Sequence, residues 1–587
     1  MSEETKRNRE FLIYFFIAFL ISLPIIFLAI ENPDLGWHLS AGRYIVENLS
    51  IPRSDFITWT KEKMPWVNSE WGTEVIYYLV YLAGKYKALY ILRLINLFLV
   101  SITMAFILRL ARVPFFNLIW FLPMFFLSIL NILDLRPDNY SILFFAFLLH
   151  FLYKRRDDEY CDSRSFMIVV TLFVVWANIH PGYTYGLFLI AIHFVGTLLN
   201  ENLGYIYGVD KKIKFTKSSK YALMFIIAFI ATFINPYGYK IYSVFWEHFL
   251  NLEKYQNFIV EWQVLDIDRV NILFYYFFSF FTVSVYLYKF IRERIVDFVD
   301  VFLLLFFVVN SVMHIRLNAY GSIVASLIFL SMFSKSLYKT RYKIIFAILA
   351  LVPVYMVALK MFPIELFNVI NDRFYFASGT YSSVNFIKEN KKYLKNLRMY
   401  NGWNIGGFLS WELYGYKKTF MDGRYIFTDM LSEHITANTY KEAWEKFSEK
   451  YNFDFAVLAI SKDVKHTIFK TSVGKKEYKF YRPYFYENID PKKWAVIYFD
   501  KRTLIIARRD RVPQNFLKDN EYVFLKPYDF DRLYIDTIID KKFLKDIKKE
   551  IIRYQRKYNG NPETFSDVFI YIFHDIIDME KGIFKYE

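Results

Sequence analysis

Acidic, imidazole and guanidinium side chains gather in a few short polar stretches between long apolar runs. A carboxylate can act as a general base, and an arginine can bind phosphate oxygens through forked hydrogen bonds. Such groups beside a membrane domain usually line a cavity or mark function. The polar residues concerned are Asp34, His38, Glu70, Glu74, Asp138, His180, Asn235, Glu261, His314 and Arg316.

The apolar runs that separate these stretches predict an integral membrane protein. The chain has 587 residues, of which 55% are hydrophobic and 21% aromatic, and its mean hydropathy is +0.21. A soluble domain is nearer 45–50% apolar. The long apolar runs stop near residue 362, so a membrane domain followed by a soluble part fits better than several soluble domains.

Eleven segments have the length and composition of membrane spans, which need about 20 mostly apolar residues. The basic run Lys6-Arg7-Asn8-Arg9 precedes the first segment, which has no small-residue cleavage site and is therefore expected to stay uncleaved. The predicted spans are 11–30, 88–108, 114–133, 139–153, 166–179, 183–199, 221–235, 271–289, 298–313, 317–334 and 343–362.

The basic residues predict the orientation of these spans. With the N-terminus inside, every dense Lys and Arg cluster falls in a cytoplasmic loop, as the positive-inside rule requires. The outer loops are then 31–87, 134–138, 180–182, 236–270 and 314–316, and the chain after residue 362 is also outside. All the polar stretches named above share this side, which predicts a site at the extracytoplasmic face.

The first outer loop predicts two short helices that do not cross the membrane. Asp34 can cap a helix that runs to about Asn48, because its carboxylate accepts from free first-turn amides. A second amphipathic helix fits residues 69–84. Both segments are too polar to span, so we expect them to lie along the membrane surface.

Several motifs in these loops resemble the GT-C superfamily of polytopic glycosyltransferases, in particular prokaryotic members related to protein-mannosyltransferases. The resemblance begins with Pro33-Asp34-x-x-Trp37-His38-Leu39-x-x-Gly42 and covers most of residues 10–510. The further matches are Arg136-Pro137, Trp176 to Pro181, Asn235-Pro236-Tyr237-Gly238, Glu261-Trp262, His314-x-Arg316, Asn401 to Gly407 and Asp422-Gly423-Arg424.

The resemblance implies an enzyme that moves a sugar from a polyprenyl-phosphate carrier to an extracytoplasmic protein, lipid or glycan acceptor. In such enzymes an acidic residue of the first outer loop is catalytic, and here Asp34 matches it as the general base. Glu31 and His38 are further catalytic candidates. The acidic pair that some members carry is spread here as Glu31 and Asp34. Direct displacement would invert the anomeric centre, since retention needs a second, nucleophilic carboxylate.

The lipid phosphate needs cations and hydrogen-bond donors at the membrane edge. For this role the resemblance suggests Arg136, Lys240 and Arg316, with His180 and His314 as further donors. Trp37 offers an aromatic face to a sugar, and Glu70 and Glu261 are acidic candidates for substrate binding. Some relatives use a divalent metal, and the oxygens of Glu31, Asp34, Asp138 and Glu261 suit one. Their spacing does not require it, so we expect no metal and no cofactor.

Each of these residues also has a structural interpretation. Asp34 can simply cap its helix and His38 can pack against it. Arg136 and Arg316 suit the interface as snorkelling side chains, and tryptophans form the aromatic belt of any membrane protein. His180 can satisfy a helix end, and Asn235 to Gly238 is typical of a helix stop and turn.

The chain after the last span predicts two further regions. Residues 363–510 alternate helix and strand patterns, which indicates an extracytoplasmic α/β domain. Expected helices are 383–390, 406–413 and 433–450; expected strands are 397–400, 418–421, 453–460, 494–499 and 503–507. Asp422-Gly423-Arg424 is typical of a turn, and Gly402 to Gly407 lacks a nucleotide-binding pattern. Residues 511–587 predict a helical tail, so that residues 1–362 form the membrane domain.

Other classes of protein fit less well. The net charge of +16 comes from loop clusters rather than a basic stripe, which argues against nucleic-acid binding. A single cysteine, Cys161, excludes a disulfide framework and a thiolate metal site. A transporter or lipid flippase would show internal repeats and polar residues at mid-membrane. A catalytically inactive GT-C-like scaffold remains a second alternative.

Overall fold

The computed structural model divides into two compact units, and each is described by itself. The first unit contains Met1–Asn32, Ala41–Arg53 and Trp66–Tyr375, and the second contains Pro33–Ser40, Ser54–Pro65 and Phe376–Glu587. The residues that the structure describes are 3–23, 32–111, 113, 115–129, 134–203, 216–259, 262–263, 270–293, 296–333, 380–460, 466–473, 476–483, 485–539 and 543–581.

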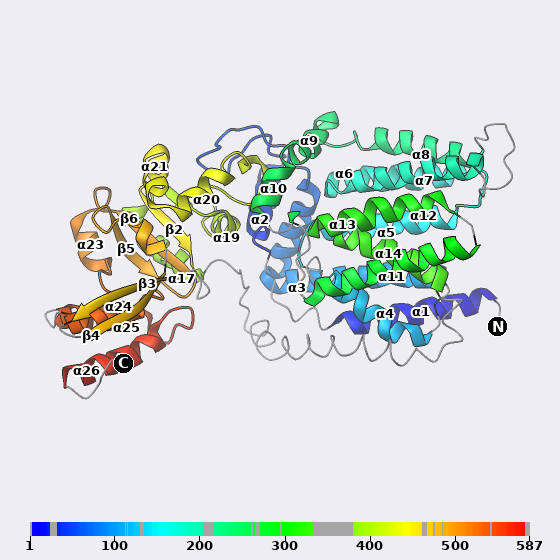
Figure 1. The fold of residues 1–587 in the computed structure, drawn as a ribbon. Helices are drawn as coiled ribbons and strands as arrows, with labels where there is room; N and C mark the ends of the chain where they lie inside the picture. Colours follow the sequence, from blue (N-terminus) through cyan, green and yellow to red (C-terminus); the bar gives the residue numbers. More distant parts are fainter. Residues whose placement is uncertain are drawn as a thin grey trace. The chain divides into compact units, whose positions relative to one another are not determined.

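The first unit consists of helices, most of which run side by side (Figure 1). The long ones are α1 (Glu3–Ser22), α3 (Trp71–Leu110), α4 (Phe115–Ser128), α5 (Asp138–Lys154), α6 (Ser163–Ile179), α7 (Tyr183–Leu203), α8 (Lys217–Ala231), α11 (Val270–Glu293) and α14 (Asn318–Phe333). Shorter elements are η3 (Gly238–Ile241), α9 (Tyr242–Leu250), α10 (Leu252–Phe258), α12 (Phe298–Leu303), the π-helical turn η5 (Leu304–Val309), α13 (Asn310–Met313) and η6 (Ile315–Leu317). Helix α2 (Leu35–Asn48) begins in residues of the second unit and ends in this one.

Apolar side chains from these helices meet in one continuous core. Tyr14, Leu97, Phe145, Phe173 and Phe307 belong to it, and each is buried. Outward-facing apolar side chains accompany this core, among them Ile91, Ile95, Ile226 and Phe280. Helices with apolar residues on both their inner and outer faces are typical of membrane spans.

The predicted spans coincide with or overlap helices wherever they fall in the described residues, whereas the last one, 343–362, lies outside them. By length and composition, two described helices could cross a membrane, Trp71–Leu110 and Tyr183–Leu203. Shorter apolar helices cover Ser163–Ile179, Phe298–Met313 and Ile315–Ser331. The total of eleven spans and their orientation therefore stay predictions.

The two helices expected in the first outer loop are both present. Helix α2 ends at Asn48, as its pattern predicts. The segment 69–84 became the first part of α3, which changes direction at Gly84 and Lys85, whose φ/ψ values are not helical. Lys85 has a φ of 54°, a conformation that residues with a side chain adopt rarely. The break separates this part from the predicted span at 88–108.

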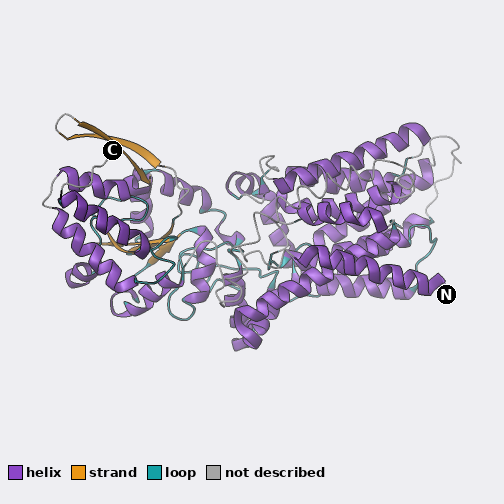
Figure 2. Ribbon diagram, turned by 90° about the horizontal axis from the view of Figure 1, so that it is seen from below, coloured by secondary structure: helices purple, strands orange, loops and turns teal. Residues whose placement is uncertain are grey.

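The second unit is built on a four-stranded sheet in the order β1-β2-β6-β5. Strand β1 (Met399–Asn401) pairs parallel with β2 (Phe455–Ala459), and β6 (Thr503–Arg508) pairs antiparallel with β2 and with β5 (Trp494–Phe499). The predicted hairpin across Asp500-Lys501 is present. A separate hairpin, β3 (His466–Val473) with β4 (Lys476–Pro483), was not expected and projects from this unit (Figure 2).

Helices cover the sheet of the second unit and share its aromatic core. They are α17 (Tyr381–Glu389), α18 (Lys391–Leu394), α19 (Trp403–Glu412), η8 (Tyr425–Phe427), α20 (Leu431–Thr439), α21 (Lys441–Tyr451), α22 (Phe485–Asn488), α23 (Gln514–Asn520), α24 (Phe530–Ile539), α25 (Leu544–Tyr558) and α26 (Ser566–Glu580). Tyr400 contacts Trp444 and Phe453, while Phe499 stacks on Tyr554 of α25. The predicted helical tail therefore packs on the sheet.

Two predicted elements of the second unit differ in the structure. The helix expected at 433–450 is divided at Tyr440, whose backbone is extended (φ −125°, ψ 135°). The strand expected at 418–421 is reduced to a single bridge between Thr419 and Thr58. Its partner comes from Ser54–Pro65, a segment far away in the sequence, so local pattern could not predict this pairing.

Candidate functional site

Three charged side chains from three of the predicted outer loops meet in the first unit. Nε2 of His180 lies 2.6 Å from Oδ1 of Asp138 and 3.2 Å from Oε1 of Glu70. Asp138 is the first residue of α5, His180 directly follows α6, and Glu70 directly precedes α3. The side chain of His180 is only 4% exposed, and those of Glu70 and Asp138 are 18% and 14% exposed. We call these residues and Arg316 the ionic cluster.

Arg316 brings a fourth predicted loop to the same place. Its Nη2 lies 3.5 Å from Oδ1 of Asp138, and its guanidinium lies over the ring of Trp262, 5.4 Å from the centroid. The side chain is 27% exposed, the largest exposed fraction in the ionic cluster. A guanidinium carries a planar fork of N–H donors, which matches the oxygens of carboxylates and phosphates.

Hydrogen bonds between α3 and α6 fix Glu70 against His180. The indole Nε1 of Trp71 donates to Oδ1 of Asn178 at 3.1 Å, and the hydroxyl of Thr73 donates to the carbonyl of Ile179 at 2.8 Å. Gly72 allows this approach, because a Cβ at its position would meet the Asn178 carbonyl oxygen at 2.5 Å. The start of α3 therefore cannot move without moving the end of α6.

The contacts of Nδ1 show which nitrogen of the His180 ring carries the proton. The backbone N–H of Gly182 donates to Nδ1 at 3.0 Å, so this nitrogen is an acceptor. The hydroxyl of Ser141 lies 2.7 Å from the same atom and accepts from Nε1 of Trp176. Its own proton is then available for Nδ1, which leaves the ring proton on Nε2, toward the two carboxylates.

The charges of the cluster support one another. Burial raises the pKa of Asp138, but Arg316 and His180 outweigh it and hold this pKa below its ordinary value. Burial lowers the pKa of His180, whereas Asp138 and Glu70 raise it more, so that it lies above its ordinary value. The Gly182 N–H opposes a second proton on the ring. Neither carboxylate aligns with the ring N–H as in a regular hydrogen bond, so the attraction is mainly electrostatic.

Residues of the predicted outer loop 236–270 bring aromatic rings to Arg316. Trp262 lies 5.6 Å from His248 and 5.5 Å from Tyr255 between ring centroids. Nδ1 of His314 donates to the Trp262 carbonyl at 3.2 Å, so this ring nitrogen carries a proton. Burial lowers the pKa of His248 to about 4, and the positive charge of Arg316 adds to this shift. The ring of His248 therefore stays neutral.

The turn from Asn235 to Gly238 is anchored rather than open. Oδ1 of Asn235 accepts from the Tyr237 N–H at 2.7 Å, and Gly238 has a φ of 56°, which favours glycine. Arg53 donates to the Pro236 carbonyl at 2.6 Å and lies over the Tyr237 ring. The expectation of a helix stop and turn at this motif is met.

Asp34 belongs to the second unit, at the start of α2. Nε1 of Trp37 donates to its Oδ1 at 3.0 Å, and the ring of His38 contacts that of Trp37 at a tilt of 36°, with 3.6 Å between ring centroids. A Cβ at Gly423 would come within 1.8 Å of the same Oδ1. Asp34 is thus held by an indole on one side and by the backbone of Gly423 on the other.

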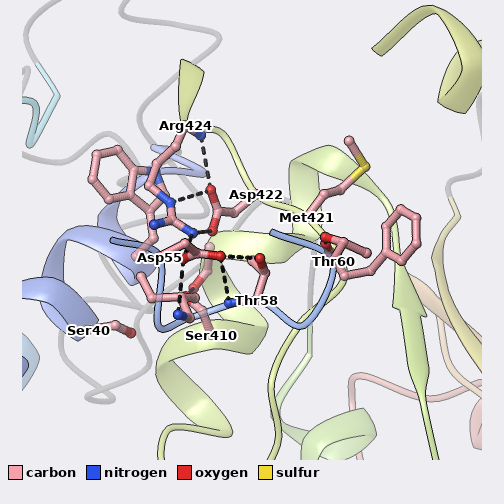
Figure 3. Close-up of polar contacts among 12 residues, drawn as sticks. Ser40, Asp55, Thr58, Thr60, Ser410, Met421, Asp422 and Arg424 are labelled. Atoms are coloured by element: carbon pink, nitrogen blue, oxygen red, sulfur yellow. Dashed lines mark hydrogen bonds and ion pairs between the residues drawn. The ribbon is translucent and has the colours of Figure 1, made fainter. Parts of the chain in front are cut away.

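The motif Asp422-Gly423-Arg424 is more than a turn. Arg424 donates from Nε and Nη2 to the two oxygens of Asp422 at 2.8 and 2.7 Å, and its Nη2 also lies 2.8 Å from Oδ1 of Asp55 (Figure 3). Each of the three side chains is exposed by no more than 1%. This buried triad joins Ser54–Pro65 to the C-terminal part of the second unit.

Glycines of α19 let this region pack closely. A Cβ at Gly406 would meet the Met421 carbonyl oxygen at 2.0 Å, and one at Gly407 would meet the Pro33 carbonyl oxygen at 2.2 Å. Gly36 on α2 faces Gly407 in the same way. The stretch Gly402 to Gly407 therefore serves helix packing beside Asp34, a role that no phosphate-loop pattern reveals.

The structure brings some of the predicted site residues together and not others. Glu70, His180 and Arg316 share the ionic cluster, with Arg136 adding positive charge near Asp138. Lys240 is exposed on η3, and no ion pair within the described residues joins it to the cluster. Asp138 was expected at the outer face and as a possible metal ligand, and the structure pairs it with His180 and Arg316. Glu31 and Glu261, both predicted, lie outside the described residues.

Metal binding finds no support in the described part of the chain. No group of three His, Cys, Asp or Glu side chains there could hold a metal ion. The carboxylates of Glu70 and Asp138 face an imidazole and a guanidinium, which already supply positive charge. Glu31 and Glu261, two of the four carboxylates considered for a metal, lie outside the described residues, so the expectation of no metal stays a prediction.

Comparison with known proteins identifies the fold. No family model and no curated protein sequence matches the chain. The structure is similar to the archaeal oligosaccharyltransferase AglB from Archaeoglobus fulgidus in complex with an inhibitory peptide and a dolichol-phosphate, with a TM-score of 0.50 and 11% identity. This match covers 98% of the present chain and 86% of the other. The oligosaccharyltransferase from Archaeoglobus fulgidus tethered with an acceptor peptide containing the NVT sequon matches with a TM-score of 0.47 and 12% identity over 76% and 68% of the two chains.

The first of these matches shows a shared fold and no more, since the identity is 11%. It agrees with the helical membrane fold that the predicted resemblance implies.

Proposed function

We propose that this chain is a membrane glycosyltransferase, which moves a sugar from a lipid-linked donor to an acceptor outside the cytoplasm. The observation that carries the proposal is the ionic cluster, in a chain with the fold of an oligosaccharyltransferase. Five predicted outer loops contribute to this cluster and to the rings around it. Charged groups gathered at one end of apolar helices are expected of an enzyme that works at the membrane surface.

The ionic cluster suits the phosphate of a polyprenyl-phosphate donor. Arg316 is the principal ligand in this proposal, because its planar fork matches phosphate oxygens and its side chain is 27% exposed. Arg136 adds positive charge, and the N–H at Nε2 of His180 adds a hydrogen-bond donor. The structure of AglB with a dolichol-phosphate makes an isoprenoid phosphate the first donor class to test.

Asp34 is proposed as the general base. In the reaction a bond forms between the acceptor oxygen and the anomeric carbon, while the bond from that carbon to the phosphate oxygen breaks. The acceptor proton passes to the Asp34 carboxylate, and the lipid phosphate leaves with the electron pair. Because phosphate leaves readily, the enzyme gains most by activating the acceptor, typically about 10²–10⁴-fold. A single displacement of this kind inverts the anomeric centre.

The acceptor class is proposed from the neighbouring structure. AglB was solved with an inhibitory peptide, so peptides with hydroxyl or amide side chains come first, before lipids and glycans. The second unit carries both Asp34 and the α/β sheet, and we propose that its surface selects the acceptor.

A transfer assay tests this proposal. Purified protein is incubated with ¹⁴C-labelled polyprenyl-phosphate mannose or glucose, or with a polyprenyl-diphosphate oligosaccharide, and with peptide, lipid and glycan acceptors. We expect label to move from the lipid to one acceptor class, and Arg316→Gln to raise KM for the donor about tenfold or more. Flux of intact labelled lipid across vesicles without transfer would instead support the transporter alternative.

A further inference from the structure

The hairpin of β3 and β4 projects from the second unit (Figure 2) and is anchored to it through β4. The backbone N–H of Tyr481 on β4 donates to Oδ2 of Asp531, the second residue of α24, at 3.2 Å. Nε of Arg482 donates to Oδ2 of Asp529 at 3.0 Å, and Asp529 is 1% exposed. These contacts fix the base of β4, whereas β3 pairs with no strand other than β4 within the described residues.

The hydrogen bond of Tyr481 shows which backbone groups of the hairpin point outward. In an antiparallel pair, directly opposite residues alternate between pairs that exchange backbone hydrogen bonds and pairs whose N–H and C=O groups point away from the partner strand. Tyr481 lies opposite Ile468, and its N–H points away to Asp531. By this alternation, the outward N–H and C=O groups of β3 include those of Ile468, Lys470 and Ser472.

The outer edge of β3, which we define by the backbone of these three residues, is exposed. Their side chains are exposed as well, that of Ile468 by 58%. Beyond the hairpin itself, the described part of the chain supplies no hydrogen-bond partner to their backbone groups. A row of such groups is a template for pairing with another extended chain. When a peptide adds as a strand, its main chain supplies affinity and its side chains supply specificity.

The side chains beside this edge favour an acidic partner. Lys470 lies directly opposite Lys479, and both are exposed on one face of the hairpin. Like charges in this position repel each other, and Glu477 offsets Lys470 only at the surface, 3.5 Å away. Residues 466–483 contain five Lys or Arg residues and one Glu, which gives a net charge of +4. A further carboxylate beside the two lysines would relieve their repulsion.

A second copy of this chain fits the edge less well than an acidic peptide does. Edge-to-edge pairing of two β3 strands would bring lysine toward lysine between two hairpins of the same positive charge. Lysines on exposed edge strands are a common means of preventing such pairing. Insertion into a bilayer is also unfavourable, because hydrocarbon leaves the backbone groups of an open edge without partners.

We propose that the outer edge of β3 binds an extended acidic peptide segment, which adds to the hairpin as a third strand. The peptide backbone pairs with Ile468, Lys470 and Ser472. Acidic side chains at every second position of the peptide lie on the face that carries Lys470 and Lys479. This inference goes beyond the proposed function, because peptide binding at the hairpin requires no sugar donor. A peptide acceptor would gain an additional binding surface in the unit that carries Asp34.

Binding is measured by fluorescence anisotropy with the full chain in nanodiscs of neutral lipid, without sugar donor. The probe is a short fluorescein-labelled peptide of alternating valine and glutamate. We expect saturable binding that weakens as the salt concentration rises. Two control peptides separate charge from backbone pairing: one has lysine in place of glutamate, and the other keeps glutamate but has proline in place of valine. Neither control should bind comparably.

Two proline variants test the edge itself. Lys470→Pro removes an outward N–H from β3, whereas Lys479→Pro removes one from β4 at the directly opposite position. Both lose one lysine and keep the hydrogen bonds between β3 and β4, so Lys479→Pro is the matched control. We expect Lys470→Pro to weaken binding about tenfold or more. Lys479→Pro and Lys470→Gln should weaken it less than about fivefold, as the loss of one surface charge does.

The outcomes distinguish strand addition from the alternatives. The proposal fails if the acidic peptide does not bind, if its proline-containing form binds as tightly, or if Lys470→Pro and Lys479→Pro weaken binding equally. The peptide should slow trypsin cleavage at Lys470; slower cleavage in nanodiscs of anionic lipid without peptide would assign the hairpin to the membrane surface instead. Pairing of two copies that Lys470→Pro abolishes would assign the edge to a second copy.

Discussion

Replacing Arg424 by methionine would leave two carboxylates, Asp55 and Asp422, facing each other without a counter-ion. The side chains of the triad are exposed by no more than 1%, so water cannot substitute for the guanidinium. Removing one partner of a buried ion pair costs about 3–5 kcal/mol. For a unit of this size each kcal/mol lowers the melting temperature by roughly 2–4 °C, which gives a decrease of about 6–20 °C.

The effect of Arg424→Met should depend on pH in a defined direction. Burial already raises the pKa of Asp422 above its ordinary value despite Arg424, and loss of the guanidinium raises it further. A raised carboxyl pKa in the folded state means that stability is retained at low pH and lost as pH rises through that pKa. The variant should therefore be destabilised less at pH 5 than at pH 8.

Two measurements on the full chain check this expectation. Thermal unfolding followed by tryptophan fluorescence gives the loss of stability. Trypsin cleavage at Lys61 and Lys63 reports release of Ser54–Pro65, which Asp55 anchors. Arg508→Met is the control, because Arg508 pairs at the surface with Asp510 and such pairs contribute about 0–1 kcal/mol. If Arg424→Met melted and was cleaved like this control, the triad would not hold the segment.

Three further predictions concern single positions. Gly423→Ala should lower kcat by displacing Asp34, since the new Cβ would lie 1.8 Å from its Oδ1; the transfer assay measures this, and an unchanged kcat would contradict it. His180→Gln removes the ring N–H that Asp138 and Glu70 face, so the melting temperature should fall by several degrees; equal stability would show that the ring is dispensable. Burial lowers the pKa of His434 to about 4 in the folded protein. Between about pH 6.5 and 4, His434 is therefore protonated in the unfolded chain but neutral in the folded protein. The wild type should lose up to about 3 kcal/mol over that range relative to His434→Gln, as chemical unfolding at several pH values can measure.

The ionic cluster is the part of the site that sequence reasoning anticipated. Placing the basic clusters on one side of the membrane put Glu70, His180 and Arg316 in loops on the other side. The structure pairs Glu70 with His180 and joins both Arg316 and His180 to Asp138. Topology signals work here because few residues lie between a span and its loop. Asp138 was missed as a cluster member because the sequence does not show which nearby carboxylate faces the ring.

The surroundings of Asp34 could not be read from the sequence. Gly423 contacts Asp34 across almost 400 residues of chain, and Asp55 meets Arg424 across a similar separation. Neither pairing leaves a local periodicity. A signal was available in the motif itself, because Asp and Arg two residues apart beside a buried strand pattern can satisfy each other. The division between α20 and α21 at Tyr440 was also not predicted, because no Gly or Pro marks it in the sequence.

The most direct test of the proposed chemistry is the rate of sugar transfer by Asp34→Asn. The substitution keeps the size of the side chain and its ability to accept from Trp37, but it removes the base. We expect kcat to fall at least about 100-fold with donor binding and melting temperature unchanged, while Asp429→Asn, which alters an exposed partner of Lys61, keeps full activity. Equal rates in Asp34→Asn and the wild type would contradict the assignment of Asp34 as the base.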